Sequence, residues 1–325
     1  MELPLRSRTP SDLVVPVRCD PAGVLGPTRT QAAGPRWRRV ARGWFVPTAA
    51  PHHVEQRILE ATAGIDGAQI TGWAALRLAG VGLVDGRDRF GADLPVPLRV
   101  VRGGLRPRDG VIMRRGLLPP EHLVETAGVP CVRPLPALLD AVRSAGDREA
   151  MVLVDAVLAA GLATRHEIEE WASTTRPRGW WSLAAAVRLA APGVRSPQET
   201  RLRLLCTLDA GRGPFLVNPR IETLEGRFVA MPDLLDEAAG LAVEYDGAGH
   251  RTREQHRADV VRAAGMQDVG VEVVTVVGAD LQDVPGVVAR LERAYERARD
   301  RAYLEVERRW RVRRPSAPPG TGHEV

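Results

Sequence analysis

The fold of the C-terminal half is decided by the stretch MPDLLDEAAGLAVEYDGAGH at residues 231–250. Its apolar runs predict two antiparallel strands, over 227–235 and 241–246, joined by a turn over 236–240. On either side the pattern predicts a helix starting at Ser196, a strand over 215–223, a helix over 252–266, a strand over 271–277 and a helix over 284–303. The predicted order of this region is therefore α-β-β-β-α-β-α.

Carboxylates are predicted to gather at the end of this strand pair. Glu244 and Asp246 share one face because side chains alternate along a strand. The turn places Asp233 of the preceding strand opposite Val243 or Glu244. Like charges at such a place repel each other, and a divalent cation relieves the repulsion; oxygen ligands favour Mg²⁺ or Mn²⁺. The sequence thus predicts a metal site made by these three carboxylates, with exposed acids at hairpin ends as the alternative.

Three further residues are predicted to support hydrolysis at such a site. His250 ends a glycine-rich turn and supplies a base for water. Asp259 and Arg262 lie three apart on the next helix, where the arginine offers a cation for the charge on phosphorus. Glu199 is the third residue of the helix that Ser196 caps, and this position predicts a capping role for it. The alternatives for the others are a loop histidine bonded to backbone and a solvated helix pair.

Composition excludes several chemistries. All 45 basic residues are arginines, and lysine does not occur in the sequence. Phosphate-binding loops that end in Gly-Lys-Ser/Thr, pyridoxal Schiff bases and kinase-type lysines are thereby excluded. The net charge of +5 and the pI of about 9.8 favour a polyanionic partner. An aromatic content of 4% favours duplex DNA over a stacked single strand.

Cysteine usage and hydropathy predict a cytoplasmic protein without membrane association. The three cysteines are an odd number and contain no Cys-x-x-Cys pair, which is typical of a reducing compartment. The longest nearly apolar stretch, residues 151–163, contains Asp155 and falls short of the about 20 residues of a membrane span. The first residues also lack the apolar core of a secretory signal.

The N-terminal region contains a basic hairpin pattern, RWRRVARGWFVP at residues 36–47. Two short strands are predicted around a turn at Arg42-Gly43, after a short helix over 28–33. A helix followed by a basic hairpin is typical of a winged-helix element, and a plain structural hairpin is the alternative. The residues predicted to contact DNA are Arg36, Arg38, Arg39 and Arg42.

Two resemblances rest on these motifs. MPDLLDEAAGLAVEYDGAGH and the following HRADVVRAAGMQDVGVEVVTV resemble the Vsr-like (very-short-patch-repair endonuclease-like) branch of the PD-(D/E)xK nucleases, over about 196–297. This resemblance implies Asp233 and the Asp246/His250 pair as the metal and catalytic centre, beside Glu244. It also implies that Asp259 is the late acidic residue of that family and that Glu199 is its first-helix glutamate. Asp246 stands where most of the superfamily has lysine.

The N-terminal half resembles AbiEi-like antitoxin proteins. The stretches that carry this similarity are TRTQAAGPRWRRVARGWFVP, ITGWAALRLAG and VRPLPALLDAVR. The resemblance implies a winged helix, a following helical region, and recognition of DNA or a partner, with no catalytic residues to transfer.

These observations predict an α/β protein of the α+β type. A restriction-endonuclease-like αβββαβ core is expected at the C-terminus, after a winged-helix-like and mostly helical region. The expected domains are a winged-helix-like element at 1–50, an AbiEi-like mixed domain at 51–178, a connecting helix and linker at 179–195, a nuclease domain at 196–305, and a basic, then disordered tail at 306–325. The predicted function is a Mg²⁺-dependent DNA endonuclease that prefers duplex DNA. A catalytically inactive DNA-binding regulator of AbiEi antitoxin type is the alternative.

Overall fold

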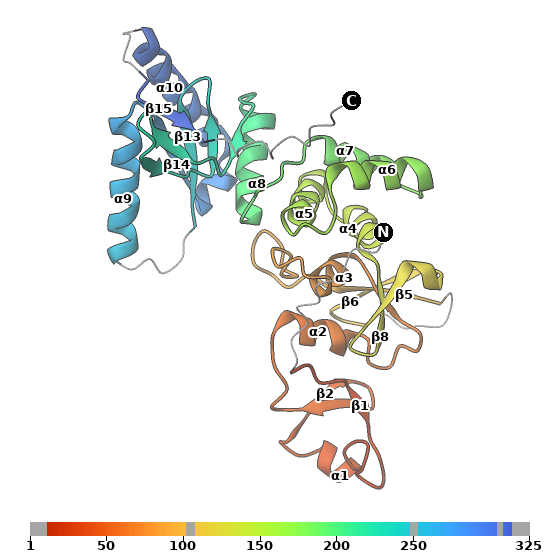
Figure 1. Cartoon of the computed structure of the whole chain (residues 1–325). Coiled ribbons are helices and arrows are strands. Elements are labelled where there is room, and N and C mark those ends of the chain that lie inside the picture. Colours follow the sequence, from red (N-terminus) through yellow and green to blue (C-terminus); the bar gives the residue numbers. More distant parts are fainter. Residues whose placement is uncertain (1–11, 102–107, 248–252, 304–307, 314–325) are drawn as a thin grey trace, which may run out of the picture. The chain divides into compact units, whose positions relative to one another are not determined.

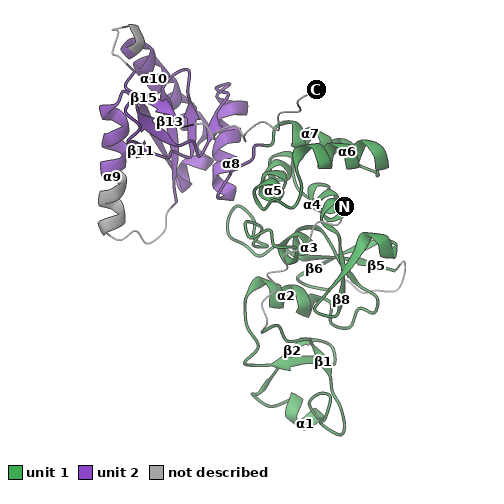
Figure 2. Cartoon of the chain, in the orientation of Figure 1, with its two compact units in different colours: residues 1–190 green, residues 191–325 purple. Residues whose placement is uncertain are grey.

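The computed structural model describes residues 12–101, 108–247, 253–303 and 308–313, with helices and several sheets (Figure 1). This mixture confirms the α+β class. The chain divides into two compact units, residues 1–190 and 191–325 (Figure 2). The division falls inside the expected connecting segment 179–195, and the other domain boundaries stay predictions. Among the described residues, no helix combines the length and the apolar character that a membrane crossing requires.

The first unit begins with a small antiparallel sheet of strand order β1-β3-β2. Its elements are β1 (Val17–Arg18), helix α1 (Arg29–Ala32), β2 (Trp37–Ala41) and β3 (Trp44–Pro47). The hairpin turns at Gly43, whose φ of +78° suits glycine. Thr28 caps α1 in a reciprocal capping box with Gln31. The short helix and the hairpin expected from the sequence are therefore confirmed.

A five-stranded sheet of order β6-β5-β4-β8-β7 follows in the same unit. Its strands are β4 (Gln69–Ile70), β5 (Val96–Val100), β6 (Val111–Arg115), β7 (Leu123–Thr126) and β8 (Val129–Val132). The helices of this part are α2 (Val54–Ala61), α3 (Gly72–Leu78), α4 (Pro134–Val142), α5 (Asp147–Ala159), α6 (Arg165–Thr175) and α7 (Trp180–Arg188), with a 3-10 turn at Pro120–His122. Buried apolar residues such as Leu98 of β5 and Val132 of β8 hold these strands in the core, and α6 starts at a capping box of Thr164 and Glu167.

The second unit contains two sheets, of order β14-β13-β12-β9 and β11-β10-β15. Their strands are β9 (Leu216–Val217), β10 (Ile221–Thr223), β11 (Phe228–Ala230), β12 (Leu234–Asp236), β13 (Leu241–Asp246), β14 (Glu272–Val277) and β15 (Trp310–Val312). The helices are α8 (Pro197–Leu204), which continues as a π-helical turn over Leu205–Asp209, then α9 (Arg253–Asp268), a 3-10 turn at Gly278–Gln282 and α10 (Val284–Tyr303). Helices α8 and α10 pack on one face of the four-stranded sheet, while α9 and the smaller sheet pack on the other.

Prolines change the strand pattern that the sequence predicts for this unit. The expected strand 215–223 breaks at Pro219 into β9 and β10, which belong to different sheets. The expected strand 227–235 breaks in the same way at Pro232, into β11 and β12. A proline lacks the N–H that a ladder requires, so the chain leaves one sheet and enters the other. Each of these two expected strands is therefore divided between two sheets, and a nuclease core stays a prediction.

Two more expectations for this unit are wrong. The apolar residues Val260, Val261 and Ala264 of the predicted helix 252–266 are expected to face the core, yet all three are exposed, because α9 packs through Met266 instead. The residues after 305 are expected to form a tail, yet β15 pairs with β10 and buries Trp310 to 2% exposure. A burial of this kind holds the arginine-rich segment that follows α10 on the sheet.

Candidate nucleic-acid interface

The four arginines expected to contact DNA lie on or beside the β2–β3 hairpin. Arg36, Arg39 and Arg42 are exposed. Arg38 has turned toward α2, and its Nη1 and Nη2 each donate to the carboxylate of Glu60 at 2.6 Å. This bidentate bond raises the pKa of Arg38 and occupies its guanidinium. Three of the four side chains are therefore presented to a ligand, while Arg38 anchors the hairpin.

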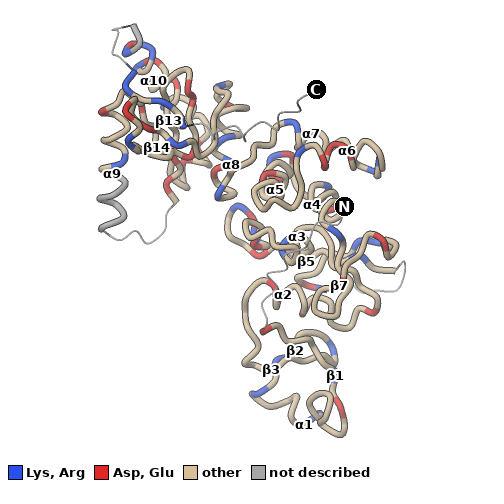
Figure 3. Tube along the Cα trace, in the orientation of Figure 1, with Lys and Arg blue, Asp and Glu red and all other residues tan. Residues whose placement is uncertain are grey.

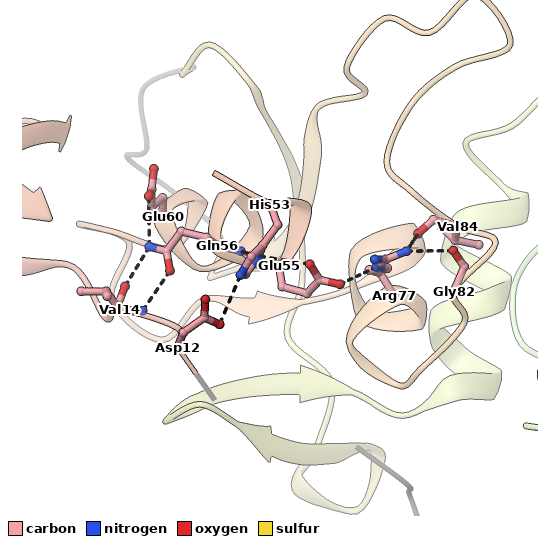
Figure 4. Close-up of polar contacts among 9 residues, drawn as sticks. All are labelled: Asp12, Val14, His53, Glu55, Gln56, Glu60, Arg77, Gly82 and Val84. Atoms are coloured by element: carbon pink, nitrogen blue, oxygen red, sulfur yellow. Dashed lines mark hydrogen bonds and ion pairs between the residues drawn. The ribbon is translucent and has the colours of Figure 1, made fainter. Parts of the chain in front are cut away.

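Helix α2 fastens the start of the described chain to the first unit (Figure 4). The Gln56 side chain exchanges two hydrogen bonds of 2.9 Å with the backbone of Val14 and donates to Glu60 at 3.0 Å. At the start of the helix, the Nδ1 of His53 accepts the backbone N–H of Gln56 at 3.3 Å, and its Nε2 lies 3.4 Å from Asp12. Residues 12–14 are therefore held against the helix that also binds Arg38.

Further hydrogen bonds connect α2 to α3 and the hairpin to Arg108. Glu55 of α2 accepts from Arg77 Nε at 2.6 Å, and Arg77 Nη1 donates to the carbonyl of Gly82 at 2.8 Å (Figure 4). Arg108 donates to the carbonyl of Val40 in the hairpin at 2.7 Å, and to carbonyls at the end of α2. Burial lowers the pKa of Arg108, and these carbonyl bonds compensate for its desolvation. The hairpin is thus fixed within its unit by paired polar groups.

Arginines outnumber carboxylates in the small sheet and the loops around it, over residues 12–53. Residues 12–53 contain six arginines and two carboxylates, and Figure 3 shows basic residues along the small sheet. Of the carboxylates, Asp20 accepts three backbone N–H groups of its own loop, and these bonds lower its pKa. The guanidinium of Arg18 lies 5.0 Å from the ring centroid of Trp44. A compact basic surface of this kind suits the phosphates of a nucleic acid.

The predicted carboxylates lie at one end of the β12–β13 pair. Leu234 pairs with Val243, so Asp233 stands at the level of Glu244, as the sequence predicts. The Oδ2 of Asp233 accepts the backbone N–H of Tyr245 at 2.7 Å. Arg262 of α9 donates through Nε to Glu244 at 3.2 Å. These carboxylates therefore lie on the side of the sheet that α9 covers.

Burial is the main reason why the pKa of Asp233 rises to about 6. The nearby carboxylates of Glu199 and Glu244 raise this pKa further, whereas the Tyr245 N–H and the charge of Arg262 oppose the rise. The structure thus brings Asp233, Glu199, Glu244 and Arg262 together. The sequence does not reveal the effect of Glu199 on the pKa of Asp233, because the two residues are 34 positions apart in the chain and only the fold brings them close.

The described carboxylates do not offer a metal ion a set of three ligands. Within the residues that the structure describes, no group of three or more His, Cys, Asp and Glu side chains is arranged to hold a metal. Asp233 is bonded to a backbone N–H, Glu244 is paired with Arg262, and Asp246 also interacts with another group. His250 lies outside the described residues, and Asp259 is described only as part of the α9 backbone. The expectation of Mg²⁺ or Mn²⁺ stays a prediction.

Glu199 acts in a way that differs from the predicted capping box. Ser196 accepts the N–H of Glu199 at 3.2 Å, which confirms half of the box. The Glu199 carboxylate instead accepts from the backbone N–H of Arg195 at 2.9 Å and from the Asn218 amide at 2.7 Å. The sequence pattern does not predict this role of Asn218. Its φ of +48°, in the left-handed region that asparagine tolerates, marks the bend before Pro219 that brings it to α8.

Thr71 stands directly before α3, where a threonine often caps a helix, but its side chain is used differently. Its hydroxyl donates to the buried carboxylate of Asp140 at 2.6 Å, and no side-chain bond closes the start of α3. Arg99 binds the same carboxylate through Nε and Nη2, at 2.6 and 2.8 Å. A buried carboxylate with these partners fixes α4 to the five-stranded sheet.

Comparison with known families gives one match. A model of the AbiEi antitoxin C-terminal domain matches residues 81–188. This region includes the stretch 132–143 that resembles AbiEi-like proteins in sequence, and the match confirms that part of the resemblance. Neither the curated proteins nor the solved structures contain a match to the chain.

The prediction of an endonuclease is wrong. The family found within the chain is an antitoxin family, and nothing in the comparisons supports a Vsr-like nuclease. The sequence prediction rests on the spacing of the carboxylates. In the structure, Asp233 accepts a backbone N–H and Glu244 accepts from Arg262, so both carboxylates have protein partners. The catalytic roles expected for Asp233, Glu244, Asp246 and His250 therefore lose the activity that motivated them.

Proposed function

We propose that this protein is a DNA-binding regulator of antitoxin type. The match of residues 81–188 to an antitoxin domain carries the proposal, because a basic hairpin precedes that region and is bonded to the same unit. The resemblance of residues 28–47 to AbiEi-like proteins supports it. Under this proposal the protein acts in the cytoplasm, where its three cysteines stay free thiols.

The hairpin supplies the contacts to DNA in this proposal. Exposed Arg36, Arg39 and Arg42 lie on or beside one hairpin, and guanidinium groups bind phosphate oxygens through charge-assisted hydrogen bonds. Contacts of this kind position a protein on duplex DNA without reading its sequence. We expect each arginine to neutralise one phosphate and to release its counterions.

The remaining regions act without catalysis in this proposal. An antitoxin has a toxin as its partner, and we assign this protein contact to residues 81–188, where the family model matches. In the second unit, Asp233 accepts a backbone N–H and Glu244 pairs with Arg262, so this proposal gives neither carboxylate a catalytic role. Binding to DNA therefore needs no divalent ion and should persist in EDTA.

The test measures binding of the full chain to a labelled 30-base-pair duplex over a range of salt concentrations, with EDTA present. The variant replaces the three exposed hairpin arginines with serine. The control replaces three other exposed arginines of the same unit, Arg115, Arg178 and Arg188. Both variants lose the same charge, so a difference between them reports the position of the arginines and not the net charge.

The hairpin variant should bind the duplex about 10- to 100-fold more weakly. Its slope of log affinity against log salt should fall by about 2.7, at about 0.9 per phosphate contact. The control variant should change each quantity by less than half as much. Equal losses in both variants would show that only net charge attracts DNA, and the hairpin would be rejected as the interface.

A further inference from the structure

The smaller sheet of the second unit has one covered face and one open face. Ile221, Ala230 and Trp310 point into the core. On the opposite face, Glu222 of the central strand is in register with Phe228 on one side and with Arg311 on the other, and neighbouring side chains cover it to 5% exposure. An aromatic ring and a guanidinium therefore flank one carboxylate across three strands.

The ring of Phe228 is the exposed aromatic group on this face. It is 54% exposed, although burial of such a ring is favourable. The guanidinium of Arg220 lies 4.6 Å from its centroid, on one side of the ring. Leu224, at the tip of the same hairpin, is exposed to a similar extent, 53%. The strands thus hold a flat ring at the surface, where it can stack on a planar group.

Arginines surround this ring. Glu222 accepts from Arg220 Nε at 2.8 Å and lies 3.5 Å from Arg313 Nη1, and the Arg220 bond lowers its pKa. Arg311 is exposed and reaches the turn, where its Nη2 lies 3.5 Å from the point that a Cβ on Gly226 would occupy. Exposed Arg227 belongs to the same turn. The face carries four arginines against Glu222 and Glu225, so its charge complements an anionic occupant.

We propose that this face binds single-stranded DNA, with Phe228 stacking on a base and Arg227, Arg311 and Arg313 contacting phosphates. An aromatic side chain stacks most readily on an unpaired base, because a base in a duplex must first be unstacked from its neighbours at a cost of about a few kcal/mol. A flat sheet face with an exposed ring and flanking arginines has this chemistry, which the low aromatic content of the whole chain conceals. The choice of DNA over RNA rests on the function proposed above, whereas the argument from stacking geometry is independent of that function.

The test uses the full chain and a labelled 20-nucleotide single strand of mixed sequence, with the matching duplex and an oligoribonucleotide as separate probes. Phe228→Ser removes the ring, and Phe228→Tyr keeps it. Leu224→Ser is the matched control, because this residue has the same exposure on the same hairpin but no ring. Thermal unfolding of each variant, which should stay unchanged for exposed residues, shows that the fold is retained.

Phe228→Ser should weaken single-strand binding by about 5- to 100-fold, Phe228→Tyr should restore it, and Leu224→Ser should change it less than twofold. Arg311→Ser should reduce the salt slope by about 0.7. Equal effects of the serine variants, failure of tyrosine to restore binding, or no single-strand binding by the wild type would overturn the proposal. RNA binding as tight as DNA binding would overturn the choice of DNA.

The two functions fail separately. Loss of duplex binding in the hairpin variant, with single-strand binding kept, supports both assignments. Single-strand binding that is lost in the hairpin variant and kept in Phe228→Ser overturns the assignment to the smaller sheet, whereas duplex binding continues to test the hairpin.

Discussion

The chain builds two small three-stranded sheets that share an arginine stacked on an aromatic ring but differ in what they expose. In β1-β3-β2, Arg18 covers Trp44, which is half-buried, and the exposed groups of the hairpin are arginines. In β11-β10-β15, Arg220 covers Phe228, whose ring is exposed, and Glu222 neutralises part of the charge. The first surface is suited to phosphates alone, and the second to a base and its phosphates.

This difference shows that net charge alone does not identify the ligand of an arginine-rich protein. Several arginines of the arginine-rich stretch 290–314 form ion pairs within the protein: Arg290 pairs with Asp280, and Arg297 and Arg301 pair with Glu272. Arg38 is used in the same way in the first unit. What decides recognition is therefore which arginines are exposed beside which shapes.

Replacement of Trp310 by alanine gives the largest expected effect and tests whether the two sheets are independent. The ring is 2% exposed and anchors β15 on the smaller sheet, and Arg308 stacks on it at 3.7 Å. Deleting a buried ring of this size costs about 3–5 kcal/mol. We expect hydrogen exchange to accelerate in β10, β11 and β15, and single-strand binding to be lost.

Trp181→Ala, at a ring that is 63% exposed in the first unit, is the control and should change stability by less than about 1 kcal/mol. Duplex binding of the Trp310 variant should stay near the wild-type value. A parallel loss of duplex binding would show that the sheets depend on each other, which contradicts the comparison.

Removal of Glu60 tests the anchor of the first sheet. Glu60→Ala leaves Arg38 without its bidentate partner and takes one acceptor from Gln56. Breaking a half-buried pair of this kind costs about 1–3 kcal/mol. Calorimetry should show a lower unfolding temperature, and duplex binding should weaken because the hairpin loses its fixed position.

Glu125→Ala, an exposed carboxylate on β7, is the control and should leave both quantities unchanged. If Glu60→Ala instead strengthened duplex binding without a cost in stability, Arg38 would be a DNA contact held in reserve, and its role as an anchor would be rejected.

The sequence predicts the helices of this protein better than its sheets. Capping residues such as Thr28 and Thr164 act on their own helix within three positions, so local pattern is enough to find them. Strand partners lie far apart in sequence: β10 pairs with β15, about 90 positions later. The prolines at 219 and 232 were visible, but nothing local says that each break also changes the sheet.

The candidate sites show the same limit. Alternation and the turn centre place Asp233 beside Glu244 correctly, because both are properties of one hairpin. The use of those carboxylates depends on Arg262 of α9 and on the backbone of Tyr245, which the pattern does not reveal. In the same way, the sequence gives no reason to distinguish Arg38 from Arg36, Arg39 and Arg42, and only the fold shows that Arg38 pairs with Glu60.

Asp233 makes the stability of the second unit depend on pH. Its pKa is raised from 3.8 to about 6, chiefly by burial, so the folded state binds the proton more tightly than the unfolded state does. The stabilisation is complete below about pH 4 and is lost as the pH rises to about 6. Asp233→Asn should remove this dependence and stabilise the protein at pH 7 by about 1 kcal/mol, a value discounted for the partial exposure of the carboxyl.

Calorimetry at pH 4.5 and pH 7 checks this expectation, with Asp300→Asn, at an exposed carboxyl on α10, as the control. The first sheet, which contains none of these groups, should bind duplex DNA equally well in the variant and the wild type at each pH. An Asp233→Asn protein that is less stable at pH 7 would show that the ionised carboxylate supports the fold.

Glu222→Gln has the smallest expected effect and tests the charge difference between the sheets directly. Glutamine keeps an oxygen for the Arg220 bond but removes the negative charge between Arg220 and Arg313. Single-strand affinity at low salt should rise about two- to fivefold, because Arg220 and Arg313 lose the carboxylate that neutralises them and attract phosphates more strongly, by up to about 1 kcal/mol. Glu292→Gln, exposed on α10, makes the same change in net charge away from this face and should have less effect. Equal gains in both variants would mean that the face senses only the overall charge of the protein, and the contrast with the hairpin would disappear.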